Sequence, residues 1–255
     1  MSRITAAFQE KRALIAFITG GDPDIETTKD LIPAMAEAGA DIIEIGIPFS
    51  DPIAEGPAIQ AASLRALTSG TTVDKLFDMV QEIRQSVRIP LLFMTYANPV
   101  FAYGTERFLQ RCSDCGIDGL IIPDVPYEEK EEFSPFCKQY GITLISQAVP
   151  AFEERAAMIA ASAEGFVYCM PASGTANSPI EASAEAINKL KHTVSIPCAV
   201  EIDNTVPEQG NAVIDCSDGL ILGNQIVKIM DEHKQNCIPF VKAYLKRVKK
   251  NYSVQ

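Results

Sequence analysis

The chain has 255 residues, which is enough for one large α/β domain or two small ones around a sizeable core. Its content of 47% hydrophobic and 22% charged residues excludes an extended disordered chain. Acidic residues outnumber Lys and Arg by 33 to 22, and the formal charge of -11 excludes a nucleic-acid backbone or an anionic membrane surface as the main partner.

The amino-terminal segment, residues 1–21, carries an apolar run that is too short for a membrane span. The run is also too short for a signal peptide, and both acid and base stand just before it. We therefore expect a cytoplasmic protein. The segment from Ile4 to Phe8 is amphipathic and is expected to form a short extra N-terminal helix.

Apolar runs alternate with segments of helical periodicity along the rest of the chain. The runs expected to form strands are Ala13 to Thr19, Asp41 to Gly46, Leu91 to Thr95, Gly119 to Ile122, Thr143 to Gln147, Gly165 to Met170, Ile196 to Ile202 and Gly219 to Leu222. The segments expected to form helices are Thr27 to Ala38, Ile59 to Leu67, Thr72 to Ser86, Thr105 to Cys115, Tyr127 to Tyr140, Glu153 to Ala161, Ala182 to Leu190 and Pro207 to Ile214. Four basic residues near the end are expected to form a solvated last helical turn: Lys246, Arg247, Lys249 and Lys250.

Strands that are apolar throughout and separated by helices predict a parallel sheet covered by helices. Eight such units in this length are what a closed (β/α)8 TIM barrel requires. No break in composition marks a second domain, so we expect residues 1–255 to form a single barrel domain. A doubly wound open sheet is the alternative, but no G-x-G-x-x-G follows the first strand.

Seven cysteines, an odd number scattered over strands and helices, favour reduced buried thiols over a disulfide framework. Cys112 and Cys115 form a C-x-x-C, but no second pair and no nearby histidine completes a zinc shell. We therefore expect both to be packing residues on a helix. With only His192 and His233 in the chain, histidine chemistry is not expected either.

The stretch from Asp41 to Gln60, DIIEIGIPFSDPIAEGPAIQ, places an acid in a buried strand at Glu44. A second acid, Glu55, follows eleven residues later in the loop before a helical run. Strand end and loop can aim both carboxylates at one pocket, and paired carboxylates in different settings separate an acid from a base. The alternative is a strand glutamate neutralised by an arginine and a solvated loop glutamate.

In a barrel the chemistry lies at the carboxyl ends of the strands. The polar residues at those ends are Asp22, Glu44, Asp51, Glu55, Tyr96, Asn98, Asp124, Gln147, Ser173, Gly174, Glu201, Asp203, Gly223 and Asn224. Most are expected to be loop caps or rim residues. The residues alone therefore predict a small-molecule barrel enzyme that uses carboxylates.

Several segments resemble the signature of the tryptophan synthase α subunit family, in the same order and with the same spacing. They are IEIGIPFSDPIAEGPAIQ (Ile43 to Gln60), FITGGDP (Phe17 to Pro23), MTYANPVF (Met94 to Phe101), PDVP (Pro123 to Pro126), Ser173-Gly174, PEQ (Pro207 to Gln209) and GNQIVKI (Gly223 to Ile229). The resemblance implies a (β/α)8 barrel that cleaves indole-3-glycerol phosphate to indole and glyceraldehyde 3-phosphate in tryptophan biosynthesis. It also implies an αββα heterotetramer, in which pyridoxal phosphate belongs to the β subunit and this chain has no cofactor.

The resemblance assigns roles to particular residues. Glu44 matches the family's catalytic acid and base, and Glu55 stands where a family aspartate pairs with the indole N–H. Substrate-binding positions are Phe17, Tyr96, Tyr168, Ser173, Gly174, Gly223 and Asn224, and positions facing the β subunit are Asp51, Pro52, Asn98 and Pro99.

The chain departs from the family pattern at the catalytic loop and at the phosphate end. Glu55 replaces an aspartate, Glu201 and Asp203 stand in a turn that is rich in glycine in the family, and Asn224 replaces a serine. The closing loop carries Ala172, Ala176 and Asn177 in place of arginine, threonine and glycine. We therefore expect impaired lyase activity.

Two other functions remain open at this stage. The chain can act as an α subunit whose main role is to bind and allosterically activate the β subunit. Alternatively, an acidic mouth formed by Glu55, Glu201 and Asp203 can bind a divalent cation or a ligand without phosphate.

Overall fold

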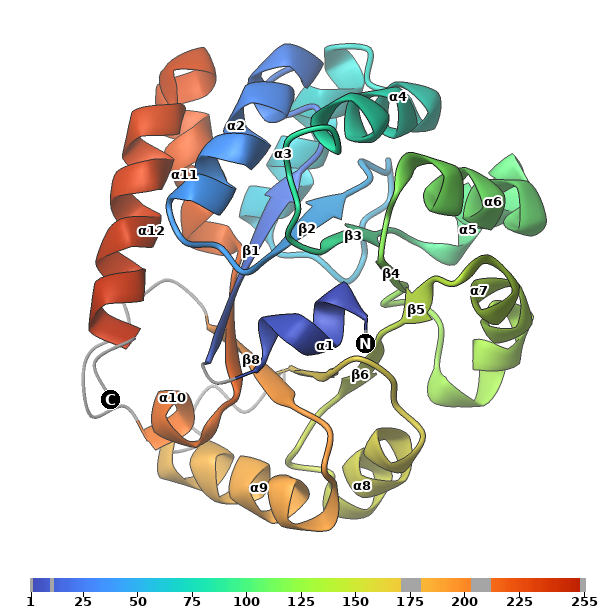
Figure 1. The fold of residues 1–255 in the computed structure, drawn as a ribbon, viewed down its shortest axis with the longest axis vertical. Coiled ribbons are helices and arrows are strands. Elements are labelled where there is room, and N and C mark those ends of the chain that lie inside the picture. Colours follow the sequence, from blue (N-terminus) through green and yellow to red (C-terminus); the bar gives the residue numbers. More distant parts are fainter. Residues whose placement is uncertain (1, 10–11, 171–179, 203–211, 253–255) are drawn as a thin grey trace.

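The computed structural model describes residues 2–9, 12–170, 180–202 and 212–252. Within them, nine parallel strands form one sheet in the order β5-β4-β3-β2-β1-β9-β8-β7-β6, and helices surround it (Figure 1). The strands are β1 (Ala13–Thr19), β2 (Ile42–Gly46), β3 (Leu91–Met94), β4 (Gly119–Ile121), β5 (Thr143–Leu144), β6 (Ser146–Ala148), β7 (Val167–Cys169), β8 (Cys198–Ile202) and β9 (Gly219–Leu222).

The two ends of this sheet meet at Ile145, because β5 and β6 are the halves of one strand. β5 pairs with β4 through Thr143 and Leu144, and β6 pairs with β7 from Ser146 onward. The Ile145 N–H donates to the Leu120 carbonyl oxygen at 2.9 Å. The predicted closed barrel is therefore confirmed, but the predicted fifth strand, Thr143 to Gln147, is divided where it changes its pairing partner.

The helices after α1 follow the strands on the outside of the barrel (Figure 1). They are α1 (Arg3–Ala7), α2 (Ile25–Glu37), α3 (Pro57–Thr68), α4 (Val73–Ile83), α5 (Ala97–Tyr103), α6 (Thr105–Cys115), α7 (Ser134–Tyr140), α8 (Glu153–Ala161), α9 (Ile180–Thr193), α10 (Ala212–Cys216), α11 (Asn224–His233) and α12 (Ile238–Tyr252), with 3-10 turns η1 (Tyr127–Glu132) and η2 (Lys234–Asn236). The predicted bounds of α6 and α8 are confirmed.

Three expectations about helices need correction. The predicted helix from Tyr127 to Tyr140 is η1 followed by α7, since Pro135 in the first turn of α7 supplies no backbone N–H and starts a new helix. The short helix α5 was missed, because Pro99 breaks the periodic pattern there. Of the helix expected from Pro207 to Ile214, residues 207–211 lie outside the described part, and α10 begins at Ala212.

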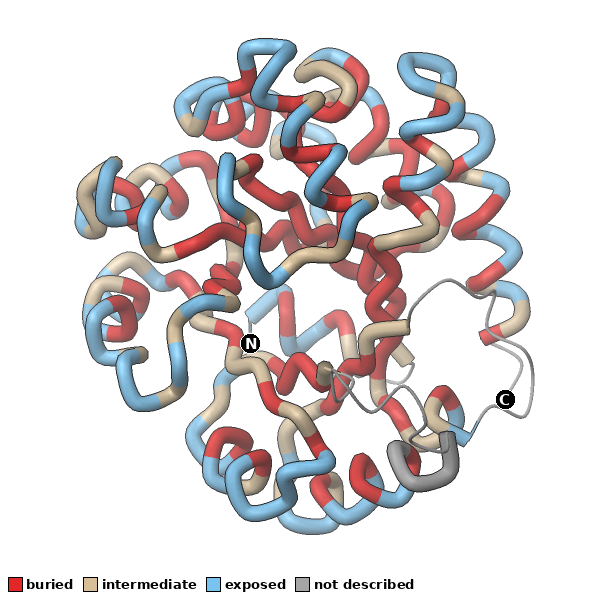
Figure 2. Tube along the Cα trace, turned by 180° about the vertical axis from the view of Figure 1, so that it is seen from behind, coloured by how far each residue is buried: buried red, intermediate tan, exposed pale blue. Residues whose placement is uncertain are grey.

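Two apolar layers hold the barrel together. The interior is filled by side chains that alternate along the strands: Ala13, Ile15, Phe17, Ile42, Leu92, Met94, Ile121, Phe166, Tyr168, Ala199 and Ile221. The opposite faces of the strands pack against the helices, whose outward faces are exposed (Figure 2). The expected N-terminal helix is present as α1, and its Ile4 and Ala7 belong to the interior cluster and plug one end of the barrel.

The basic end of α12 is not simply a solvated turn. Lys249 donates to Asp41, a carboxylate that also accepts the Leu14 N–H at 2.8 Å and is only 8% exposed. The last helix is thus tied to the beginning of the strand that carries Glu44. Within the described residues no helix combines the length and apolarity that a membrane crossing needs.

Candidate active site

Glu44 lies in the middle of β2 with its side chain in the barrel interior. Its neighbours in the sheet register are Phe17 and Leu92, which both belong to the interior cluster. The residue is 0% exposed, and neither carboxyl oxygen has a hydrogen-bond partner among the described residues. Burial, followed by the charges of Glu201 and Glu55, raises the pKa of Glu44 to about 8. At neutral pH this carboxyl group therefore carries a proton that it can donate.

Glu55 lies in the loop between β2 and α3. Two hydrogen bonds tie the loop to residues outside it: the Ala54 N–H donates to the Tyr96 hydroxyl at 3.1 Å, and the Gln60 amide donates to the Glu55 carbonyl oxygen at 2.8 Å. Burial and then the charge of Glu201 raise the pKa of Glu55 to about 7. The loop thus presents a second carboxyl group close to half ionisation at neutral pH.

Glu201 is a third carboxylate in the same electrostatic environment. It lies on β8, two residues after the interior residue Ala199, so the alternation of the strand turns it inward. The Tyr168 hydroxyl hydrogen-bonds to it. Burial and the charges of Glu201, Glu44 and Glu55, in that order, raise the pKa of Tyr168 well above its usual range. The structure therefore gathers three carboxyl groups around one phenol.

A cavity lies beside these groups, although Glu44 itself is not among the described residues that line it. Its wall includes Glu55, Glu201 and four of the predicted substrate-binding residues: Phe17, Tyr168, Gly223 and Asn224. No lysine, arginine or histidine is among the described residues that line it. The cavity therefore suits a ligand with an apolar ring and with polar groups that are neutral or positively charged.

The remaining predicted substrate residues have other positions. Tyr96 is not among the described lining residues, and it supports the loop of Glu55 through its hydroxyl. Burial and the charge of Glu55 raise the pKa of this phenol to about 12. Ser173 and Gly174 lie outside the described residues, as do Asp203 and the altered loop positions Ala172, Ala176 and Asn177.

Several cavity residues were not singled out from the sequence. Met94, Met170, Ile59 and Ile221 line the cavity, and each looks like an ordinary core residue in the chain. Their only signal was a position at or just after the carboxyl end of a strand, or in the first turn of the following helix. Gln147 was noted as such a strand-end residue, and it does line the cavity.

Two other acids at strand ends make structural hydrogen bonds instead. Asp124 accepts the Ala97 N–H at 3.0 Å and so caps the first turn of α5. Asp22 is buried and accepts two hydrogen bonds from Arg65 at 2.8 Å each. Neither carboxylate is a described lining residue of the cavity.

The predicted partner-facing residues lie in two segments: Asp51 and Pro52 in the loop after β2, and Asn98 and Pro99 in the first turn of α5, after β3. Asp51 and Asn98 are exposed, and Pro52 and Pro99 are partly exposed. Each pair has an exposed apolar neighbour: Ile53 is 82% exposed and Phe101 is 51% exposed. Ile53 and Phe101 are therefore apolar side chains that remain in water next to these residues.

The residues considered for metal binding do not form a metal site in the described part of the chain. Cys112 and Cys115 lie on α6 and are buried in the core. Burial raises the pKa of both thiols, which supports the packing role. No group of three or more His, Cys, Asp or Glu side chains in the described ranges can hold a metal ion. The suggested set of Glu55, Glu201 and Asp203 includes a residue outside those ranges.

The comparisons with known proteins all match one protein family. The sequence model of the family described as tryptophan synthase alpha chain matches residues 4–253. The tryptophan synthase alpha chain of Lacticaseibacillus casei is 38% identical, over 98% of this chain and 95% of its own, and that of Thermoanaerobacter sp. (strain X514) is 40% identical, over 98% and 99%. Among solved structures, tryptophan synthase subunit alpha from Legionella pneumophila str. Paris has a TM-score of 0.90 at 30% identity, covering 99% of this chain and 98% of that one. A chain of Mycobacterium tuberculosis tryptophan synthase has a TM-score of 0.89 at 28% identity, covering 100% and 99%.

Proposed function

The chain belongs to the tryptophan synthase alpha chain family, and we propose that it cleaves indole-3-glycerol phosphate with Glu44 as the acid and base. The family is a lyase whose α chain needs no cofactor of its own, while pyridoxal phosphate belongs to the β subunit that is its partner. The roles of individual residues and the rate of the reaction in this chain are our proposals.

The observation that carries the proposal is the burial of Glu44 with both carboxyl oxygens unpaired among the described residues. Retro-aldol cleavage delivers one proton to the ring carbon that loses the side chain and removes one proton from the hydroxyl that becomes the aldehyde. A neutral carboxyl group can do both, because one oxygen donates while the other accepts. With a pKa of about 8, Glu44 is ready to donate at neutral pH.

Glu55 would stabilise the positive charge that develops on the indole ring, as the aspartate of the family does. The extra methylene of glutamate moves the carboxylate by about 1.5 Å, and a displacement of about 1 Å can cost on the order of a hundredfold in rate. Its pKa of about 7 also leaves a fraction of the molecules with a neutral group at physiological pH. Both effects support a lyase that works more slowly than its relatives.

The negative charge of Glu201 would repel the phosphate of the substrate. A carboxylate about 5 Å from a phosphate charge costs roughly 3 kcal/mol at an effective dielectric near 20. No described cationic side chain lines the cavity to offset this repulsion. We therefore expect weak binding of the substrate as well as slow chemistry.

A steady-state assay of indole-3-glycerol phosphate cleavage, with the chain alone and with the β subunit added, tests this function. We expect a low but measurable rate that falls by about 10²–10⁴ in Glu44→Gln, the usual contribution of general acid–base catalysis. Glu82→Gln, which changes an exposed glutamate on α4, is the matched control and should keep the wild-type rate. Cleavage that is absent in both wild-type assays, or equal in wild type and Glu44→Gln, would refute the proposal.

A second candidate function is activation of the β subunit without significant cleavage. It is favoured by the contrast between the acidic cavity and the exposed apolar residues Ile53, in the loop after β2, and Phe101, on α5. This candidate predicts that the chain raises the turnover of indole plus serine by the β subunit even after Glu44→Gln. If the variant binds the β subunit but gives no stimulation, the candidate is wrong.

A further inference from the structure

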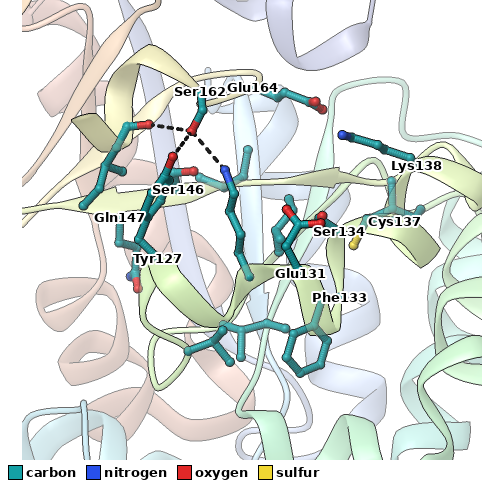
Figure 3. Close-up of a pocket in the computed structure, with 17 residues that line it drawn as sticks. Tyr127, Glu131, Phe133, Ser134, Cys137, Lys138, Ser146, Gln147, Ser162 and Glu164 are labelled. Atoms are coloured by element: carbon teal, nitrogen blue, oxygen red, sulfur yellow. Dashed lines mark hydrogen bonds between the residues drawn. The ribbon is translucent and has the colours of Figure 1, made fainter. Parts of the chain in front are cut away.

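A second cavity lies outside the barrel wall between α7 and α8 (Figure 3). Its inner side is the divided strand, where Leu144, Ile145, Ser146 and Gln147 all contribute to the lining. The residues of β5 are only partly buried, as are Ser146 and Gln147 of β6, whereas β1 to β4 are buried throughout. The barrel wall is therefore left open to a ligand at the place where the strand changes partners.

The cavity has an apolar interior and a polar rim. Ile122, Phe133, Ile142 and Ile159 are buried lining residues that supply apolar surface. The rim carries hydroxyl and charged groups, and Figure 3 shows Tyr127 and Ser162 together at one end of the cavity and Phe133 well away from them. Such a division suits a ligand with an apolar body and one polar end.

The polar end is organised around the Ser162 hydroxyl. It shares a hydrogen bond of 2.8 Å with the Tyr127 hydroxyl and accepts one of 3.0 Å from the Lys130 ammonium. The ammonium also stands 4.2 Å from the centre of the Tyr127 ring. These contacts fix the position of a cation at the edge of an apolar cavity.

Two lysines, Lys130 and Lys138, line the cavity, and neither has a carboxylate partner among the described residues. Lys130 is the one that stands beside Ser162. Among the described residues it takes part in no ion pair, whereas Lys189 on α9 pairs with both Glu153 and Glu185. Its ammonium has three N–H donors, of which the Ser162 contact uses one. An anionic group of a ligand can take the others.

We propose that this side cavity binds a small organic monocarboxylate, whose carboxylate is held by the Lys130 ammonium beside Ser162 and whose apolar body lies against Phe133 and Ile159. The Ser162 hydroxyl itself donates to the Ile159 carbonyl oxygen at 3.3 Å, so the donors for the ligand are those of Lys130. Once the carboxylate has paired with Lys130, the other charged lining residues are Glu131, Glu164 and Lys138, so the remaining net charge is negative and disfavours a second negative charge on the ligand. The site is distinct from the barrel cavity, although Gln147 lines both. It therefore does not depend on the proposed lyase activity.

Binding of 3-phenylpropionate, followed by NMR chemical shifts of the whole chain, tests the site. We expect saturable binding with a dissociation constant on the order of 1 mM, as befits a ligand of this size. Lys130→Gln should weaken it about tenfold or more, because it removes a hydrogen bond between charged groups. Lys189→Gln, the matched control, should leave the dissociation constant unchanged.

Two further measurements separate the side cavity from other binding places. Ser146→Phe fills the inner side of the cavity and should abolish binding, and 3-phenylpropionamide, which lacks the charge, should bind as weakly to the wild type as the acid binds to Lys130→Gln. No saturation by 3-phenylpropionate up to 20 times the expected constant, or the same constant in wild type, Lys130→Gln and Ser146→Phe, would overturn the proposal.

Discussion

Arg65 binds the buried carboxylate of Asp22 with two parallel hydrogen bonds, Nε to Oδ1 and Nη2 to Oδ2, each 2.8 Å long. Its third nitrogen lies 2.8 Å from Asp231 on α11. Arg65 belongs to α3, the helix that follows the Glu55 loop, and Asp22 follows β1. The Arg65 side chain therefore joins α3 to the segment after β1 and to α11.

Asp22→Asn should destabilise the fold because it leaves Arg65, which is only 22% exposed, without its buried counter-charge. We expect a loss of about 2–3 kcal/mol in the free energy of unfolding, typical of hydrogen bonds to charged groups. Urea unfolding followed by circular dichroism measures it. Asp78→Asn, which breaks an exposed pair with Arg111, should leave the midpoint nearly unchanged. Equal midpoints for Asp22→Asn and wild type would contradict the structural role given to this pair.

The barrel was predictable from the sequence because its strands and helices are repeated local patterns. α6 and α8 show helical spacing, and Gly116 ends α6 with a left-handed φ of 90° that favours glycine. The division of the fifth strand was not predictable, since Thr143 to Ala148 is continuous in the chain and only its partners change. The contact between Asp41 and Lys249 joins residues 208 positions apart, which no local pattern reveals.

The site was partly predictable for a related reason. An acid in an apolar strand, Glu44, has few explanations other than chemistry, and the burial of its unpaired carboxyl group agrees with that interpretation. Glu201 was predicted as a strand-end residue, as a departure at the phosphate end and as part of an acidic mouth with Glu55, but not as a neighbour of Glu44. Its closeness to Glu44 and Glu55 depends on the inward turn of β8, and so does its hydrogen bond with Tyr168.

The raised pKa of Glu44 predicts how stability depends on pH. Between the usual value of 4.5 and the native value of about 8, the folded chain keeps the proton while the unfolded chain loses it, so stability falls as pH rises through this window. At pH 8 the cost is roughly 4 kcal/mol, at 1.36 kcal/mol per pKa unit. Glu44→Gln does not titrate and should avoid it.

Thermal unfolding at several pH values checks this dependence. The melting temperatures of wild type and Glu44→Gln should agree near pH 5, and the variant should be the more stable one at pH 8. Glu82→Gln should follow the wild type throughout. If the difference between wild type and Glu44→Gln does not change with pH, Glu44 is ionised in the folded chain and the proposed proton donor is absent.

Glu55→Asp should raise the rate of cleavage. The shorter side chain withdraws the carboxylate by about 1.5 Å toward the place it has in the family, and a correction of this size is worth on the order of tenfold to a hundredfold in kcat. Steady-state kinetics with indole-3-glycerol phosphate measures the change. An unchanged or lower kcat would show that the loop held by Tyr96 and Gln60 has already adapted to glutamate.

Glu201→Gly should act on substrate binding more than on the chemical step. Removing a carboxylate worth roughly 3 kcal/mol of repulsion should lower KM by on the order of a hundredfold. The variant also removes a charge that raises the pKa of Glu44 and Glu55, so the pH profile of kcat/KM should shift to lower pH. A lower kcat with an unchanged KM would instead assign Glu201 a part in the reaction itself.

Ile53→Asp should weaken the complex with the β subunit. Ile53 is 82% exposed beside Asp51 and Pro52, and an apolar side chain buried at an interface typically costs about 1–2 kcal/mol or more when it is lost, with a further penalty for a buried charge. We therefore expect the dissociation constant measured by calorimetry to rise tenfold or more. The matched control is Leu64→Asp, because Leu64 on α3 is 67% exposed and lies away in sequence from the predicted partner-facing residues. This variant should keep the wild-type affinity. If both variants bind the β subunit as tightly as the wild type does, the loop after β2 is not the docking surface, and the partner roles proposed for Asp51 and Pro52 must be given up.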